Sequence, residues 1–318
     1  LAAAFWFGVV VSVIAFGLVL LVVPRSSTRT AARLDVTGAA LLAAGLVALL
    51  LAIAQGEEWG WSSPVELLLL AAAAVLLGVW VRHQLRCAAP IVQLRLLRHP
   101  AVLTGDGCAI VLGVAMYAYL SSVTEFVQTP RSAGYGFGAS VVLAGLTLVP
   151  FSVVNFGASR ALPWLTAQVG ARRLLPSGCL VVAVSGVFFA LWHDALWQAF
   201  VMMGVLGAGL GATFAMIPGL IVASVPDSET GSALGFYQVV RYIGFSLGSA
   251  VAAAVLAAAT PLGSSLPTEG AYVRVLWVGV GICLAAAALA WLLPGHHRRP
   301  GMGEVTRMTR EQDGPVRS

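Results

Sequence analysis

The chain has 318 residues, of which 59% are hydrophobic and 10% are charged, whereas charged residues make up about 25% of a typical soluble domain. This composition excludes a soluble globular protein and predicts an all-α integral membrane protein. The formal net charge of +5 does not indicate nucleic-acid binding, because the basic residues lie in short segments between apolar runs, where they set membrane topology. We therefore expect the lipid bilayer, and no nucleic acid, as a partner.

Nine apolar runs follow one another along the chain, and each is close to the roughly 20 residues that an α-helix needs to cross a bilayer. They cover residues 4–23, 37–55, 64–82, 101–127, 138–159, 173–192, 197–224, 232–259 and 272–293. The runs are continuous rather than alternating, and a helix satisfies its own backbone hydrogen bonds in lipid. They predict a bundle of about nine transmembrane helices.

Arginines are distributed unevenly between the two sides of these runs. Only Arg131 and Arg274 lie on one side, and Arg241 falls within a run. The other side has fifteen: Arg25, Arg29, Arg33, Arg82, Arg86, Arg95, Arg98, Arg160, Arg172, Arg173, Arg298, Arg299, Arg307, Arg310 and Arg317. Because basic loops stay in the cytoplasm, we expect the amino terminus outside and the carboxy terminus inside. All 18 basic residues are Arg, which is typical of a GC-rich genome and indicates a bacterial inner (plasma) membrane.

No metal or redox motif is apparent. The four cysteines lack CxxC spacing and are expected to act as small buried apolar residues: Cys87, Cys108, Cys179 and Cys283. His296 and His297 lie in the polar tail, where metal binding is the alternative to simple solvation. We expect no metal and no cofactor.

Enzyme motifs are also absent, since the sequence contains no HExxH, GxSxG or P-loop pattern. His193 and Asp194 are adjacent in a predicted outer loop, where a solvated pair is favoured over a catalytic base. We expect no catalytic residues and no enzyme activity, with an integral membrane enzyme kept as the less favoured alternative.

Glycines cluster in the seventh and eighth runs with GxxxG spacing. Such glycines let two helix backbones approach closely, so a packing role is predicted for Gly204, Gly207, Gly211, Gly244 and Gly248. Pro150 and Pro218 fall inside predicted helices and are expected to kink them.

Three segments resemble the fourteen-span drug:proton antiporters of the major facilitator superfamily. LDVTGAALLAAGLVALLLAIAQGEEWGWSSP (34–64) is similar to that family's seventh span and following loop. PIVQLRLLRHPAV (90–102) resembles the linker before its ninth span, and VPDSETGSALGFYQVVRYIGFSLGSAVAAAV (225–255) the entry to its thirteenth. The resemblance implies that the nine runs match spans 6 to 14 of the family and that its first five spans are missing from this sequence.

A cytoplasmic loop motif of the superfamily is partly present. PWLTAQVGARR (163–173) keeps four residues of the pattern: Leu165, Gly170, Arg172 and Arg173. Ala167 and Gln168 stand where the pattern often has Asp and Arg, so this loop lacks two of the charged residues on which its role in the superfamily depends.

The resemblance implies a division of the chain into four parts. Residues 1–36 would be the last helix of an amino-terminal bundle with its cytoplasmic loop, and residues 37–100 two accessory helices with a basic linker. Residues 101–294 would form a six-helix carboxy-terminal bundle, and residues 295–318 a cytoplasmic tail. The expected function is proton-coupled efflux of small amphipathic compounds, incomplete without the missing amino-terminal bundle. A non-transporting membrane subunit or a decayed transporter fragment is the alternative.

Asp106 and Arg241 are the clearest ionisable residues inside the predicted helices. A charge at a helix centre costs about 2.5–3.5 kcal/mol on insertion scales, so such residues usually face a cavity or a partner. We expect both to contribute to coupling; the alternative is that Asp106 lies near the interface and Arg241 packs against a neighbouring helix. The further coupling candidates are Glu125, Tyr117, Asn155 and Gln238.

Overall fold

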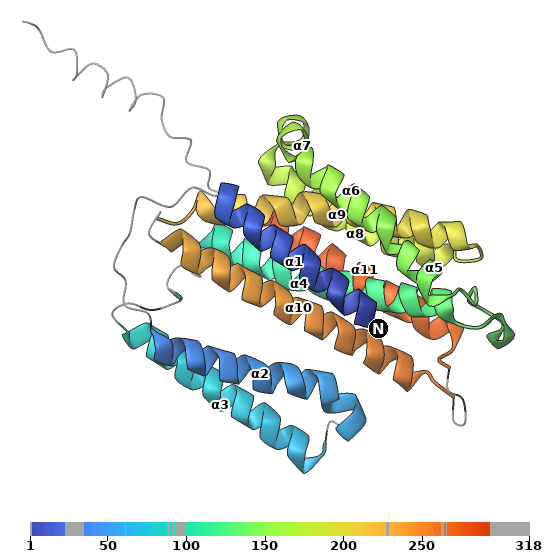
Figure 1. The fold of residues 1–318 in the computed structure, drawn as a ribbon, viewed down its shortest axis with the longest axis horizontal. Coiled ribbons are helices and arrows are strands. Elements are labelled where there is room, and N and C mark those ends of the chain that lie inside the picture. Colours follow the sequence, from blue (N-terminus) through green and yellow to red (C-terminus); the bar gives the residue numbers. More distant parts are fainter. Residues whose placement is uncertain are drawn as a thin grey trace, which may run out of the picture. The chain divides into compact units, whose positions relative to one another are not determined.

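The computed structural model describes residues 2–22, 35–60, 62–87, 90, 92, 94, 99–226, 229–261, 264 and 266–292. All regular elements in these residues are helical (Figure 1): α1 (Ala2–Val22), α2 (Val36–Trp59), α3 (Pro64–Arg86), α4 (Pro100–Gln128), η2 (Arg131–Ala133), α5 (Val141–Leu146), α6 (Leu148–Arg160), α7 (Leu162–Val169), α8 (Ala171–Leu191), α9 (Leu196–Val222), α10 (Thr230–Ala258) and α11 (Glu269–Leu292). Within the described ranges, 8 helical segments are long and apolar enough to cross a membrane. The predicted all-α membrane architecture is confirmed.

The chain divides into two units, Leu1–Leu34 and Asp35–Ser318. The first unit contains α1. The apolar segment of α1, Gly8–Val22, is shorter than the 8 helical segments that are long enough to cross a membrane. The hydroxyl of Ser12 donates to the carbonyl of Gly8 at 2.8 Å, so this polar group is satisfied within the helix.

Helices α2 and α3 form a hairpin at the start of the second unit (Figure 1). Asp35 caps α2 by accepting from Gly38 N at 2.8 Å, and Ser63 caps α3 by accepting from Glu66 N at 3.2 Å. Buried positions recur at heptad spacing on both helices, as in a left-handed helix pair: Gly38, Gly45 and Ala52 on α2, and Glu66, Ala73 and Trp80 on α3. The basic linker that follows lies mostly outside the described residues.

The helices from α4 to α11 form one bundle, in which α4 contacts α9, α10 and α11. Helix α8 contacts α9 and α11, and α6 lies on α9. Tyr119 of α4 is fully buried, and its hydroxyl donates to Leu276 O of α11 at 3.2 Å. Its ring lies against Gly186 and Gly279, where any added Cβ would overlap it. These glycines therefore make room for the buried Tyr119 ring.

Gly244 and Gly248 bring α10 against α4. A Cβ added at Gly244 would overlap the backbone of Ile110, and one added at Gly248 would overlap the backbone of Val114. The contacts advance by one turn on both helices, so α4 and α10 run parallel with their backbones touching. Helix α2 lies against α10 as well.

Helix α9 approaches α6 in the same way. Gly207 lies against the backbone of Phe151, and Gly211 against that of Asn155. Gly204 is looser, because its nearest neighbour would be Pro150 Cβ at 3.8 Å, which is ordinary van der Waals contact.

The fifth apolar run, expected as one helix, is divided in two. Helix α5 ends at Leu146 and α6 begins at Leu148. Pro150 accounts for this break, because it has no N–H to donate to the Leu146 carbonyl and its ring crowds that carbonyl. Pro218, in contrast, lies inside α9, which continues to Val222.

Candidate functional site

Two open grooves lie side by side on the surface formed by α4 and α10. The first, of about 590 Å³, is closed on one side by Leu50, Ile53 and Ala54 of α2. The second, of about 560 Å³, follows α4 as far as Gln128. Both are lined by Tyr117 and Ser249. Apolar walls with a few hydroxyl groups are typical of sites for small organic molecules.

Arg241 lies next to the first groove inside a cage of four aromatic rings. Its Cζ atom lies 5.3 Å from the ring centre of Phe214, 5.6 Å from Tyr237, 5.7 Å from Tyr242 and 5.7 Å from Phe245. A guanidinium is attracted to an aromatic face within about 6 Å. The Nε atom is buried and has no hydrogen-bond partner among the described residues. The rings therefore give favourable contacts to a guanidinium that is partly removed from water.

Asp106 of α4 is the second charged group in this region. Its side chain is buried, and neither carboxyl oxygen has a hydrogen-bond partner in the described part of the chain. Neighbouring Val102, Cys108 and Ala109 belong to an apolar cluster with residues of α9 and α10. An ionised carboxyl would be unpaired in these apolar surroundings, which is the setting of many proton-carrying carboxyls in membrane proteins.

Tyr237 lies near both groups, because its ring centre is 5.6 Å from Arg241 Cζ and its side chain belongs to the apolar cluster that contains the neighbours of Asp106. Asp106 lies about 9 Å along α4 from its first residue, at 1.5 Å per residue. Gly244 of α10 lies against Ile110 of α4. Because Arg241 and Asp106 precede these two residues by three and four positions on parallel helices, they lie at nearly the same depth in the bundle.

The cage also forms the wall of the first groove. Tyr242 and Phe245 line it, and Tyr117 stacks on Phe245 with ring centres 5.1 Å apart. A molecule in this groove would therefore contact the outer faces of rings whose other neighbours include the Arg241 guanidinium.

Glu125 and His193 lie near the other end of α4. Glu125 lines the second groove and accepts a hydrogen bond from the Tyr272 hydroxyl at 3.1 Å. His193 Nδ1 contacts Phe189 O at 3.0 Å, and its Nε2 contacts Glu269 Oε1 at 3.0 Å. His193 thus pairs with Glu269 rather than with the exposed Asp194 of the expected solvated pair.

Asn155 and Gln238 line neither groove. Asn155 lies on α6, with its backbone against Gly211, and Gln238 is exposed on α10. Of the six coupling candidates, the structure therefore gathers Asp106, Arg241 and Tyr117 at the contact of α4 with α10.

The loop motif surrounds the junction of α7 with α8. Leu165 lies in α7 and packs against the apolar cluster near Asp106. Gly170 has φ +83° between the two helices, a conformation that favours glycine. Arg173 is exposed, whereas the Arg172 side chain lies outside the described residues.

Sequence reasoning missed the cage and one buried acid. Tyr237, Arg241 and Phe245 recur at four-residue spacing on α10, a pattern that predicts one helix face, but Phe214 comes from another helix and carries no such signal. Glu66 of α3 is fully buried, and neither carboxyl oxygen has a hydrogen-bond partner among the described residues. Glu66 follows Ser63 by three residues, which is the spacing of a capping box. This local pattern does not predict that the side chain is buried.

Replacing Arg241 with Gln is expected to destabilise the protein by about 1–2 kcal/mol, because a partly desolvated cation loses its contacts with four rings. The measurement is the midpoint of thermal unfolding in detergent. Arg274→Gln is the control, since Arg274 is exposed on α11. Equal midpoints for the two variants would show that the cage does not stabilise the fold.

Comparison with known proteins covers most of the chain. The model of the Major Facilitator Superfamily matches residues 1–249. The probable actinorhodin transporter of Streptomyces coelicolor is 31% identical over 244 residues, which are 73% of this chain and 41% of that protein. The multidrug resistance protein Stp of Mycobacterium tuberculosis is 30% identical over 76% of this chain and 44% of its own length. The cephamycin export protein CmcT of Amycolatopsis lactamdurans is 29% identical over 90% of this chain and 59% of its own length. The chain thus spans less than two-thirds of each of these relatives.

Proposed function

Because the chain belongs to the Major Facilitator Superfamily, we propose that it forms part of a proton-coupled exporter of small amphipathic, drug-like compounds. The names of similar proteins include multidrug resistance and cephamycin export, which supports this substrate class. The observation that carries the proposal is the buried carboxyl of Asp106, which has no hydrogen-bond partner in the described part of the chain and lies on α4, whose contact with α10 also carries the aromatic cage and the open groove.

In this proposal the first groove holds the compound and Asp106 carries the proton. Aromatic faces of Tyr117, Tyr242 and Phe245 bind an apolar or cationic molecule without demanding one shape. Asp106 takes up a proton when its side of the bundle faces the outer solution and releases it when it faces the cytoplasm. Arg241 remains positively charged throughout, and its electrostatic attraction to the nearby carboxyl changes when that carboxyl gains or loses a proton.

The partner in this proposal is an amino-terminal helical bundle, since transporters of this kind bind substrate between two halves that rock against each other. The face of α4 and α10 that carries both grooves is the surface that would meet this bundle. The protein would function in the plasma membrane and would not be an enzyme.

The test is efflux of an amphipathic cationic dye from cells that express the full-length protein containing this chain. Preloaded cells should lose dye against its gradient, and a protonophore should stop the loss at once. Cells expressing an equal amount of a variant with both Asp106→Asn and Arg241→Gln serve as the control. Dye retention equal to that of cells without the protein would favour a non-transporting membrane subunit.

The arginine distribution predicts which loops face outward. In a variant with Cys87 replaced by Ser, new cysteines at Ser62 and Ser132 should react with an impermeant thiol reagent added to intact cells. Both residues are exposed in loops at the predicted outer side, whereas a cysteine at Thr306 should react only after lysis. The reverse labelling pattern would contradict the proposed orientation.

A further inference from the structure

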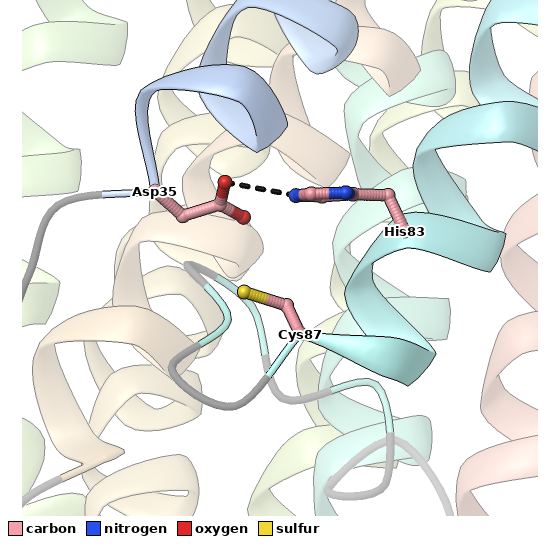
Figure 2. Close-up of side chains that lie close together, drawn as sticks. All are labelled: Asp35, His83 and Cys87. Carbon is pink, nitrogen blue, oxygen red and sulfur yellow. Dashed lines mark hydrogen bonds and ion pairs between the residues drawn. The ribbon is translucent and has the colours of Figure 1, made fainter.

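The open end of the α2–α3 hairpin brings together three side chains of different chemistry. Asp35 precedes α2, His83 lies in the last turn of α3, and Cys87 follows α3 directly. Their oxygen, nitrogen and sulfur atoms all lie within 4.8 Å of one another. Figure 2 shows the Asp35 carboxylate facing the His83 ring, with the Cys87 sulfur turned toward them. The cluster lies outside both grooves and includes none of their lining residues.

Local structure holds each of the three groups in place. Asp35 Oδ1 accepts from Gly38 N at 2.8 Å and contacts His83 Nε2 at 2.9 Å. Both contacts lower the pKa of the Asp35 carboxyl, and the hydrogen bond from Gly38 N has the larger effect. The carboxyl is therefore ionised at neutral pH. His83 and Cys87 are four residues apart at the end of one helix, which puts their side chains on the same face.

Polar atoms beside the cluster remain unused. Asp35 Oδ2 is buried and has no hydrogen-bond partner among the described residues. The same holds for both side-chain polar atoms of Gln84, which is 4% exposed. Gly38 has no side chain here, and a Cβ at this position would overlap Asp35 Oδ2 and come within 2.6 Å of Gln84 Nε2. The cluster is thus bordered by a carboxylate oxygen and a side-chain amide that have no hydrogen-bond partner among the described residues.

We propose that Asp35, His83 and Cys87 form a zinc site, with the carboxylate, Nε2 and Sγ as three ligands and water as the fourth. Zinc takes this mixture of oxygen, nitrogen and sulfur ligands at about 2.0–2.3 Å, which sets neighbouring ligand atoms roughly 3.4–3.6 Å apart. The observed spacing allows this geometry after small side-chain rotations. The CxxC pattern sought in the sequence does not describe such a site, because Asp35 lies 48 positions before His83.

Charge and proton balance are consistent with this ion. One carboxylate and one thiolate neutralise Zn²⁺, and the Cys87 proton passes to solvent when the metal binds. His83 binds through Nε2, so the proton now shared with Asp35 moves to Nδ1 and the metal takes its place. Gln84 is placed to hydrogen-bond the remaining carboxylate oxygen or the zinc-bound water, the kind of outer contact that orients metal ligands. Exposed Arg82 and Arg86 nearby oppose cation binding, so the two anionic ligands are both required.

A bound ion would tie the beginning of α2 to the end of α3. The hairpin is already connected at its other end by the turn between Trp59 and Pro64, so the metal would close it at both ends. It would also fix the point where α3 leads into the basic linker.

The test measures zinc bound to the purified 318-residue chain. The protein carries no polyhistidine tag and has His296→Ala and His297→Ala, so that the tail cannot bind the metal. After treatment with a chelator, zinc chloride is added, free metal is removed, and metal is determined by atomic emission. One zinc per chain is expected, with affinity lowered about tenfold or more by His83→Ala or Cys87→Ser. His99→Ala is the matched control, because His99 is exposed and lies outside the cluster.

A second measurement uses the cysteines as they are. Cys108, Cys179 and Cys283 are buried, whereas Cys87 is partly exposed, so a maleimide should label Cys87 first. Zinc should slow this labelling in the original protein but not in His83→Ala. Equal zinc binding by His83→Ala and His99→Ala, or labelling of Cys87 that zinc does not slow, would overturn the proposal.

Discussion

Replacing Asp106 with Asn is expected to abolish proton-driven efflux by the full-length protein while leaving it folded. Asn has the same shape, and the Asp106 carboxyl oxygens have no hydrogen bond or ion pair with described residues that the change would break. What the variant loses is the ability to bind and release a proton. The rate of efflux driven by a pH gradient, measured in vesicles, should fall to that of vesicles without the protein.

The same variant should still exchange substrate across the membrane. Exchange of labelled for unlabelled compound moves no net protons, so it requires the groove but not a titrating carboxyl. Asp194→Asn is the control for the same chemical change, since Asp194 is exposed in a loop. Unchanged gradient-driven efflux and unchanged pH dependence in Asp106→Asn would leave this residue as a packing group.

Replacing Gly248 with Leu is expected to prevent normal folding of the bundle. Any Cβ at this position meets the backbone of Val114, which a change of side-chain rotamer cannot relieve. Overpacking in a core typically costs about 1–3 kcal/mol, and the cost here should exceed that range because two helices must separate. The yield of monodisperse protein after detergent extraction should fall to a small fraction of the original.

Gly235→Leu provides the matched control on the same helix. Gly235 is exposed, and a Cβ there would have no described atom within 4 Å. This variant should be extracted normally and unfold at nearly the original temperature. If Gly248→Leu behaved in the same way, the close contact of α4 with α10 would not be needed for folding.

Sequence alone was sufficient to identify the membrane helices. Whether a segment enters lipid depends on its own length and composition. The apolar runs therefore correspond to helices with errors of a few residues at their ends, except that the fifth run forms two helices, α5 and α6. Proline and capping residues at helix starts are also local signals, as at Ser63–Pro64 of α3. The resemblance to a transporter family was also recognisable from sequence motifs alone, and the match to the superfamily model agrees with it.

The candidate site could be predicted only in part. Asp106 and Arg241 were identifiable because ionisable residues are rare in membrane helices. That Asp106 is buried, with no hydrogen-bond partner among the described residues, depends on how α9 and α10 pack beside it. The break before α6 could be anticipated from Pro150, but the continuation of α9 past Pro218 to Val222 could not.

Tertiary structure alone decided which side chains meet. Phe214 joins the cage from α9, and Asp35 reaches His83 across 48 positions of sequence. In a soluble protein an apolar stripe on a helix marks the face that will be buried. Here lipid is as apolar as the protein core, so hydrophobicity does not distinguish the faces that pack against helices from those that contact lipid. The sequence therefore determines which segments cross the membrane, whereas helix packing determines which of their faces form the cage, the grooves and the cluster at the end of the hairpin.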